Sequence, residues 1–297
     1  MLFRSATPPA MQGPKQQTCG SDYMIDAMRQ VGIKYVAAIP GNTFKSMHES
    51  VINYGMLTQP EMRHLTITHE ETAVAMAHGY FKVSGKPMAA LVHGTVGLQH
   101  ATMALYNAYC DRTPLFCFVG VRLDAAKRTT PTDWLHTAND GPALTREFTK
   151  WDDTPGSLTH FGESMIRGYK FAMTPPYGPI VIGCDQDLQE MDIPSGQAPM
   201  IPKLTMASLP QGEDGAVRAA AKMLAAAEFP LIIADRAART PQGLKLLVEL
   251  AETLQAGVID QGGRMNFPWR HPLNVTYAQE LAVGNCDCVL GVELTDF

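Results

Sequence analysis

The chain has 297 residues, of which 45% are hydrophobic and 18% charged, so it can bury one large core or two of ordinary size. A net charge of -5 offers no positive surface for nucleic acid, and no basic run indicates binding to a membrane surface. Apolar stretches are interrupted before about 20 residues, which excludes a transmembrane helix. The six cysteines are scattered, which predicts free thiols, and the pair Cys286 and Cys288 lacks the further ligands of a metal site. We therefore expect no metal site.

The first 20 residues are polar, rich in proline and glutamine, and without periodicity. This composition predicts a disordered leader over residues 1–20. The first five residues are too short for a signal peptide and do not read as a natural start. We expect a cytoplasmic protein, with export left open because the natural N-terminus is expected to be missing.

Apolar, β-branched runs alternate with helical patterns between residues 21 and 190. This alternation predicts an α/β fold, in which a parallel sheet is covered by helices on both faces to give three layers. The expected strands are Lys34–Ile39, Leu65–Thr68, Met88–Val92, Leu115–Val119 and Ile180–Cys184. The expected helices are Asp22–Gln30, Lys45–Tyr54, Glu70–Val83, Leu98–Tyr109 and Phe161–Ala172.

Two segments depart from this alternation. Residues 121–156 form a polar excursion, of the kind that is either functional or packed on a partner. Residues 191–210 contain four prolines and read as an interdomain linker. A second, Rossmann-like α/β unit follows over residues 211–297, and because the chain stops soon after the expected strand Cys288–Val292, we expect this unit to be truncated.

Functional sites of parallel α/β sheets lie at the carboxyl ends of the strands. Pro40-Gly41-Asn42 follows the first expected strand, and Glu70 begins the helix after the second. His93-Gly94-Thr95 follows the third strand, with Gly97 two residues later. Because glycine permits close approach of the backbone, a carboxyl group beside these turns suits a flat, nitrogen-containing ring.

Each of these residues also has a purely structural interpretation. An acid in the first turn of a helix, such as Glu70, complements the helix dipole. His93 could be a hydrogen-bonded core residue, and Pro40-Gly41-Asn42 is ordinary turn chemistry.

The segment from Thr68 to Tyr80, taken together with His93-Gly94-Thr95-Val96-Gly97, resembles the N-terminal pyrimidine-binding domain of thiamine-diphosphate-dependent enzymes. The similar members are those of the acetolactate synthase and benzoylformate decarboxylase type, and the spacing from Glu70 to Tyr80 matches their pattern. The resemblance implies that Glu70 activates the aminopyrimidine ring and that His93 handles protons near the substrate. It further implies that the cofactor is bound by Pro40, Gly41, Asn42, Glu70, Gly94, Thr95 and Gly97. Asn42 departs from the family, which has serine or glycine there.

The resemblance covers a pyrimidine-binding domain at 21–190 and part of a central domain at 211–297. It implies a 2-oxo acid substrate, decarboxylation or carboligation, and a homo-oligomer in which another subunit completes the site. Mg²⁺ would be held by a C-terminal domain with a Gly-Asp-Gly sequence, which these residues lack, so we expect the chain alone to be inactive. Leu231–Arg236 departs from the flavin-containing members, so FAD is not expected, although the resemblance leaves it open.

Two other hypotheses remain. A nucleotide- or flavin-binding oxidoreductase would carry Gly-x-Gly-x-x-Gly after the first strand, where this chain has Ile39-Pro40-Gly41-Asn42. A non-catalytic dimerising module would keep the fold and tolerate the substitution Glu70→Gln.

Overall fold

The computed structural model describes residues 16–58, 61–208 and 210–295. The chain forms two compact units, which divide between Ala207 and Ser208. Residues 1–15 of the expected leader lie outside the described residues. Gln17 and Thr18 donate hydrogen bonds to acidic side chains of α1 (Gly20–Gln30).

A six-stranded, wholly parallel sheet in the order β2-β1-β3-β4-β6-β5 forms the centre of the first unit. All five expected strands are present, which confirms the α/β fold class. The strands of this sheet are β1 (Tyr35–Ala38), β2 (Arg63–Thr66), β3 (Ala89–Val92), β4 (Phe116–Val121), β5 (Trp151–Asp153) and β6 (Ile180–Asp185).

Strand β5 was not expected, because three residues, two of them aspartates, carry no strand periodicity. It forms because the end of the polar excursion pairs with β6, with Trp151 opposite Ile180. A short, polar strand is a common way to end a sheet without exposing a long unpaired edge.

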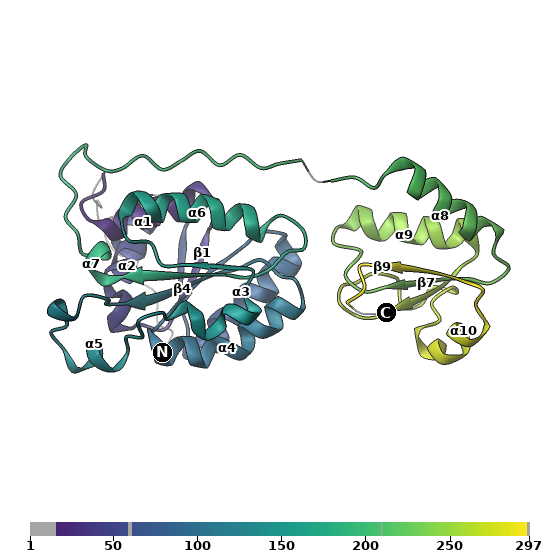
Figure 1. Cartoon of the computed structure of the whole chain (residues 1–297), viewed down its shortest axis with the longest axis horizontal. Helices are drawn as coiled ribbons and strands as arrows, with labels where there is room; N and C mark the ends of the chain where they lie inside the picture. The colour runs from purple at the N-terminus through teal and green to yellow at the C-terminus, as the bar shows by residue number, and fades with distance from the viewer. Residues whose placement is uncertain (1–15, 59–60, 209, 296–297) are drawn as a thin grey trace, which may run out of the picture. The chain divides into compact units, whose positions relative to one another are not determined.

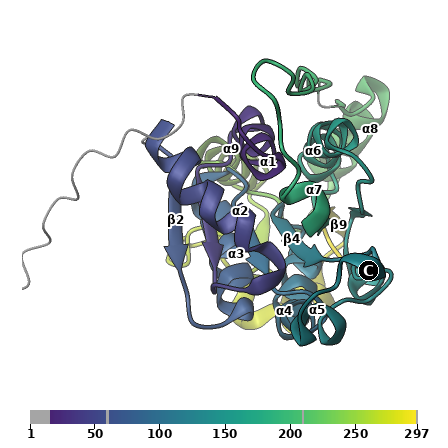
Figure 2. The same ribbon diagram turned by 90° about the vertical axis from the view of Figure 1, so that its left-hand side faces the viewer.

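Helices cover both faces of this sheet. In Figure 1, α1 and α6 (Leu158–Ala172) lie above it, and α3 (Glu70–Ser84) and α4 (Thr95–Cys110) lie below. The turned view in Figure 2 likewise has β4 between α6 and α4. The shorter elements are η1 (Asn42–Phe44), α2 (Lys45–Ser50), η2 (Val51–Met56), η3 (Ala125–Lys127), α5 (Pro131–Leu135), η4 (Pro142–Phe148) and α7 (Gln186–Gln189).

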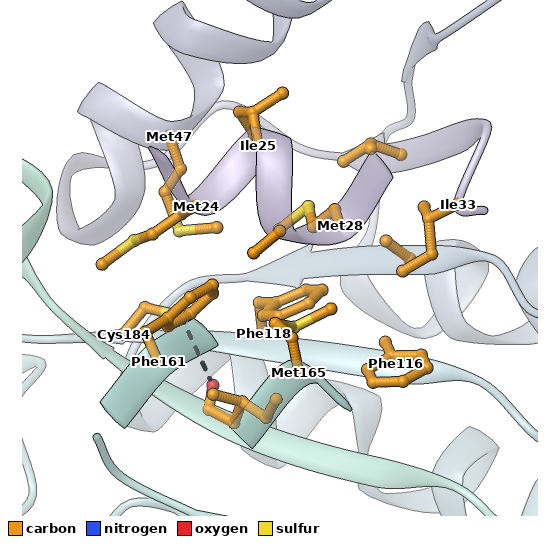
Figure 3. Packing of buried hydrophobic residues seen from close by; sticks show 14 of the residues in the cluster. Met24, Ile25, Met28, Ile33, Met47, Phe116, Phe118, Phe161, Met165 and Cys184 are labelled. Atoms are coloured by element: carbon orange, nitrogen blue, oxygen red, sulfur yellow. Dashed lines mark hydrogen bonds between the residues drawn. The ribbon is translucent and has the colours of Figure 1, made fainter. Parts of the chain in front are cut away.

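The upper layer is an apolar core between the sheet and the helices α1 and α6. Met24 and Met28 of α1 lie over Phe118 of β4, and Phe161 and Met165 of α6 pack against the same strand (Figure 3). Burial of such a side chain contributes about 1.5–3 kcal/mol relative to exposure. This packing fixes the height of α1 and α6 above the sheet.

Helix α3 is delimited by local signals at both ends. The His69 side chain accepts a hydrogen bond from the Glu71 N–H at the N-cap, and Gly85 ends the helix with φ of 69°. Glycine adopts this left-handed conformation at no steric cost. Glu70 is therefore fixed as the first residue of the helix.

The second unit has a parallel, three-stranded sheet in the order β8-β7-β9. Its core includes Ile232, Leu247, Val258 and Phe267. None of the helices in the described parts of the chain has the length and apolar content needed to cross a bilayer. The elements of the second unit are α8 (Asp214–Ala226), β7 (Pro230–Ala234), α9 (Pro241–Leu254), β8 (Gly257–Asp260), η5 (Thr276–Ala278), α10 (Gln279–Asn285) and β9 (Cys288–Val292).

Candidate active site

Strand β1 lies between β2 and β3, so the segments that follow these three strands meet at one edge of the sheet. The turn at Gly41 and Asn42 follows β1, Glu70 follows β2, and His93 follows β3. A Cβ on Gly41 would lie 2.5 Å from Cδ2 of His93. The sequence-predicted residues of these three segments are thus brought together.

The Glu70 carboxyl group is buried against helix α4. Its side chain is 9% exposed, although it is the first residue of α3. A Cβ on Gly97 would lie 2.9 Å from Oε1 of Glu70 and 2.8 Å from Cβ of His93. The absence of a side chain at Gly97 therefore makes the space in which the Glu70 carboxyl group lies.

Two further histidines lie beside this carboxyl group. Nδ1 of His100 is 3.4 Å from Oε2 of Glu70, and the rings of His69 and His100 are stacked with their centroids 4.8 Å apart. One ligand atom from each of these three residues lies within 4.8 Å of the others. No chemistry was expected of His69 or His100 from the sequence, although His100 lies one helical turn after Gly97.

Both ring nitrogens of His93 are engaged by the protein. Its Nε2 accepts a hydrogen bond from the backbone N–H of Asn42 at 3.2 Å, and its Nδ1 lies 3.0 Å from Nδ1 of His136. The Gly94 N–H donates to the same Nδ1 at 3.1 Å and also to Oγ1 of Thr43 at 3.0 Å. Burial lowers the pKa of His93, the neighbouring His136 lowers it further, and Glu70 opposes this shift. The lowered pKa and the N–H groups that point at its ring favour the neutral form of His93.

The excursion after β4 is anchored in this site. The side-chain amide of Asn42 donates to Oδ1 of Asp133 at 3.2 Å, and the Thr95 N–H donates to the carbonyl of His136 at 2.9 Å. A Cβ on Gly94 would lie only 2.0 Å from that carbonyl oxygen. Helix α5 is therefore held against the first turn of α4, and its residues belong to the site.

Asp133 is buried and stays ionised within this anchor. Burial raises its pKa, but hydrogen bonds from the backbone N–H groups of Thr130 and Thr129 reverse the direction, so the net shift is downward. The Thr130 side chain in turn caps α5 by accepting from the Asp133 N–H. A fixed carboxylate thus orients the Asn42 side chain.

The structure places the expected residues unequally. Glu70 and His93 both lie against Gly97, whereas Pro40 is exposed and the backbone N–H of Thr95 already donates to the His136 carbonyl. His136, Asp133 and Thr43 were not predicted as site residues, because periodicity does not reveal which strand end a loop reaches. The polarity of the excursion was the only available signal.

The chain is similar to known proteins along both of its units. Residues 18–140 match the model of the thiamine pyrophosphate enzyme N-terminal TPP binding domain, and residues 217–296 match that of the central domain of the same enzymes. An acetolactate synthase of Bacillus subtilis is 23% identical over 245 residues, which are 81% of this chain and 40% of that protein. A probable 2-ketoarginine decarboxylase of Pseudomonas aeruginosa is 28% identical over 296 residues, which are 96% of this chain and 50% of that protein.

The fold also matches a solved structure, that of a benzoylformate decarboxylase from Polynucleobacter necessarius. The TM-score is 0.73 at 23% identity, over 93% of this chain and 47% of the other. This chain spans half or less of the length of these three relatives. The two family models together match more than half of the chain, in the order of the two structural units. The chain therefore belongs to the thiamine pyrophosphate enzyme family.

Proposed function

We propose that this chain is the pyrimidine-binding part of a thiamine-diphosphate-dependent enzyme that decarboxylates or ligates 2-oxo acids. The observation that carries the proposal is the buried Glu70 carboxyl group, which lies in the space left by Gly97. When bound, the cofactor supplies a carbanion equivalent that adds to the substrate carbonyl. The donor set of this chain fits such a group, because a buried acid beside a side-chain-free position can hydrogen-bond the nitrogen of a flat ring.

The proposed roles follow the positions of the residues. Glu70 holds a proton at the pyrimidine nitrogen, and Gly97 lets the ring approach. We propose that Asn42 and His93 lie near the substrate. The remaining expected cofactor contacts, which we propose to act through the backbone and the shape of the turns, are Pro40, Gly41, Gly94 and Thr95.

Another subunit of the complete enzyme would complete the site. Met103 and Tyr106 of α4 are 55% and 46% exposed, close in sequence to His100, and Met76 of α3 is also exposed. Large apolar side chains gathered on neighbouring helices are typical of a surface that is covered by a partner. We propose that this face packs on another subunit, and that Mg²⁺ and the diphosphate are held by a domain outside these residues.

Calorimetry tests the half-site directly. The 297-residue chain, titrated with thiamine diphosphate and Mg²⁺, should show no micromolar binding, and micromolar affinity would contradict the division of the site. Titration with Zn²⁺ alone is the control, because His69, Glu70 and His100 offer three ligand atoms to a cation.

The substrate class needs the enzyme that contains this chain together with a diphosphate-binding domain. We expect turnover of a 2-oxo acid that depends on thiamine diphosphate, with release of CO₂. A panel of aliphatic and aryl 2-oxo acids would identify the substrate. Turnover that does not depend on thiamine diphosphate, or no turnover of any 2-oxo acid, would contradict the proposal.

A further inference from the structure

We infer that His136, on the excursion after β4, presents the hydrogen-bonding nitrogen of this site to the substrate, and that His93 is a positioning residue that fixes the tautomer of His136. The inference rests on the proposed function for the identity of the substrate. It rests on the contacts of the two rings for the assignment of roles.

His93 has no ring nitrogen left for a substrate. Its Nε2 accepts from the Asn42 N–H at 3.2 Å, and the Gly94 N–H points at its Nδ1 at 3.1 Å. The Gly94 N–H has a second acceptor in Oγ1 of Thr43, whereas the Asn42 N–H has Nε2 alone among the described residues. We therefore assign the proton of His93 to Nδ1, from which it is donated to Nδ1 of His136 at 3.0 Å. The rings meet edge to face, with centroids 4.4 Å apart and planes at 85°. Both ring nitrogens of His93 are therefore occupied by groups of the protein.

His136 consequently carries its own proton on Nε2. In the described parts of the chain this nitrogen has no hydrogen-bond partner, and the residue is partly exposed. Its backbone is fixed at both polar groups, because its N–H donates to the Thr132 carbonyl at 3.0 Å and its carbonyl accepts from the Thr95 N–H at 2.9 Å. The Nε2–H of His136 is thus held beside the first turn of α4, and the hydrogen bond to His93 sets the direction in which it points.

With His93 protonated at Nδ1, a further proton on its ring would have to sit on Nε2 and would place an N–H against the Asn42 N–H. The charged groups that face the pair are Glu70, which attracts such a proton, and Asp133, which acts on Asn42 from α5. An N–H donor at Nε2 of His136 suits a carboxylate or carbonyl oxygen of a 2-oxo acid.

The first test does not depend on activity. Nitrogen-15 NMR of the 297-residue chain at pH 7.5 should show His93 protonated at Nδ1 and His136 protonated at Nε2. The variants His93→Gln and His136→Gln assign the two sets of signals among the nine histidines. A His93 protonated at Nε2 would overturn the inference, whatever the enzyme does.

The second test uses the complete enzyme. The substitution His136→Phe should lower kcat/KM about 10- to 100-fold, as expected when a hydrogen bond to a charged group is lost. His136→Gln keeps an N–H donor and should recover most of this loss. His93→Phe should lower kcat/KM to a similar extent, and the double variant should be no worse than His136→Phe, because the two residues act as one unit.

Controls separate this inference from the proposed function. His271→Gln, in the second unit, should leave kcat/KM unchanged, and thermal unfolding of each variant checks that it folds. If Glu70→Gln abolishes activity while His136→Phe does not change it, the inference fails and the proposed function stands. If Glu70→Gln is also without effect, the proposed function itself fails, and the NMR tautomers then decide the arrangement of the two rings.

Discussion

Oε1 of Glu70 lies 2.9 Å from the position that a Cβ on Gly97 would occupy, so a residue of α3 fills the space left by a glycine of α4. These helices pack on the same face of the sheet and share one apolar core. The contact that joins them is therefore also the contact that places the carboxyl group. Chemistry and stability can be tested separately here. Glu70→Gln removes the acid, and Gly97→Ala fills the space in which the carboxyl group lies.

In the complete enzyme, Glu70→Gln should lower kcat about 10²- to 10⁴-fold, the range for loss of a positioned acid or base. The amide fills the same volume but cannot share a proton with a ring nitrogen. Steady-state kinetics with saturating thiamine diphosphate measures the effect. Glu71→Gln is the matched control, because this neighbour is exposed and should change kcat by no more than a few-fold.

Gly97→Ala should destabilise the chain by about 1–3 kcal/mol, because its Cβ would meet both Glu70 and His93. Gly79→Ala on α3 is the matched control. No described atom lies within 4 Å of a Cβ at Gly79, so alanine should stabilise the chain by about 0.5–1 kcal/mol. Urea unfolding of the 297-residue chain measures both, and equal effects would contradict the close packing at Gly97.

The stability of the chain should fall as the pH is lowered from 6.5 to 4, in part because of His64 on β2. Burial, and secondarily the charge of His48, lowers the pKa of His64 from 6.5 to about 4. In this window the unfolded chain binds more protons than the folded one, so protons favour unfolding.

Comparison with His64→Gln isolates this contribution to the pH dependence. Urea unfolding between pH 4 and 7.5 should give a shallower dependence for the variant than for the parent chain. A proton NMR titration of His64 should remain flat down to about pH 5, one unit above its lowered pKa. Titration near pH 6.5 would show that its ring is solvated.

Thr43→Val should cost about 1–3 kcal/mol of unfolding free energy, because the buried Gly94 N–H loses its hydroxyl acceptor. That N–H would then face the Nδ1–H of His93. Thr43→Ser keeps the hydroxyl and should recover most of the loss. Denaturant unfolding measures the stability, and a Val variant as stable as the Ser variant would argue against this hydrogen bond.

Much of this arrangement could be predicted from the sequence. Strand and helix periodicity gave the parallel sheet, and the positions of Glu70, His93 and Gly97 at strand ends gave their proximity, because parallel strands end at one edge. The contribution of His136 could not be predicted. It lies 43 residues from His93 in an irregular segment, and only the fold shows that the two rings meet. Short-range patterns of hydrophobicity carry no information on such a contact.

The anchoring of α5 has a consequence for attempts to redesign the pocket. Around Gly94 and Gly97 the turns are closed to any larger residue, since each added Cβ would collide with backbone or with Glu70. Variation at these turns should mainly yield misfolded proteins. Trp134 and Leu135 on α5 are 57% and 74% exposed, so mutant libraries that aim at new substrate preferences are better directed to the residues flanking His136.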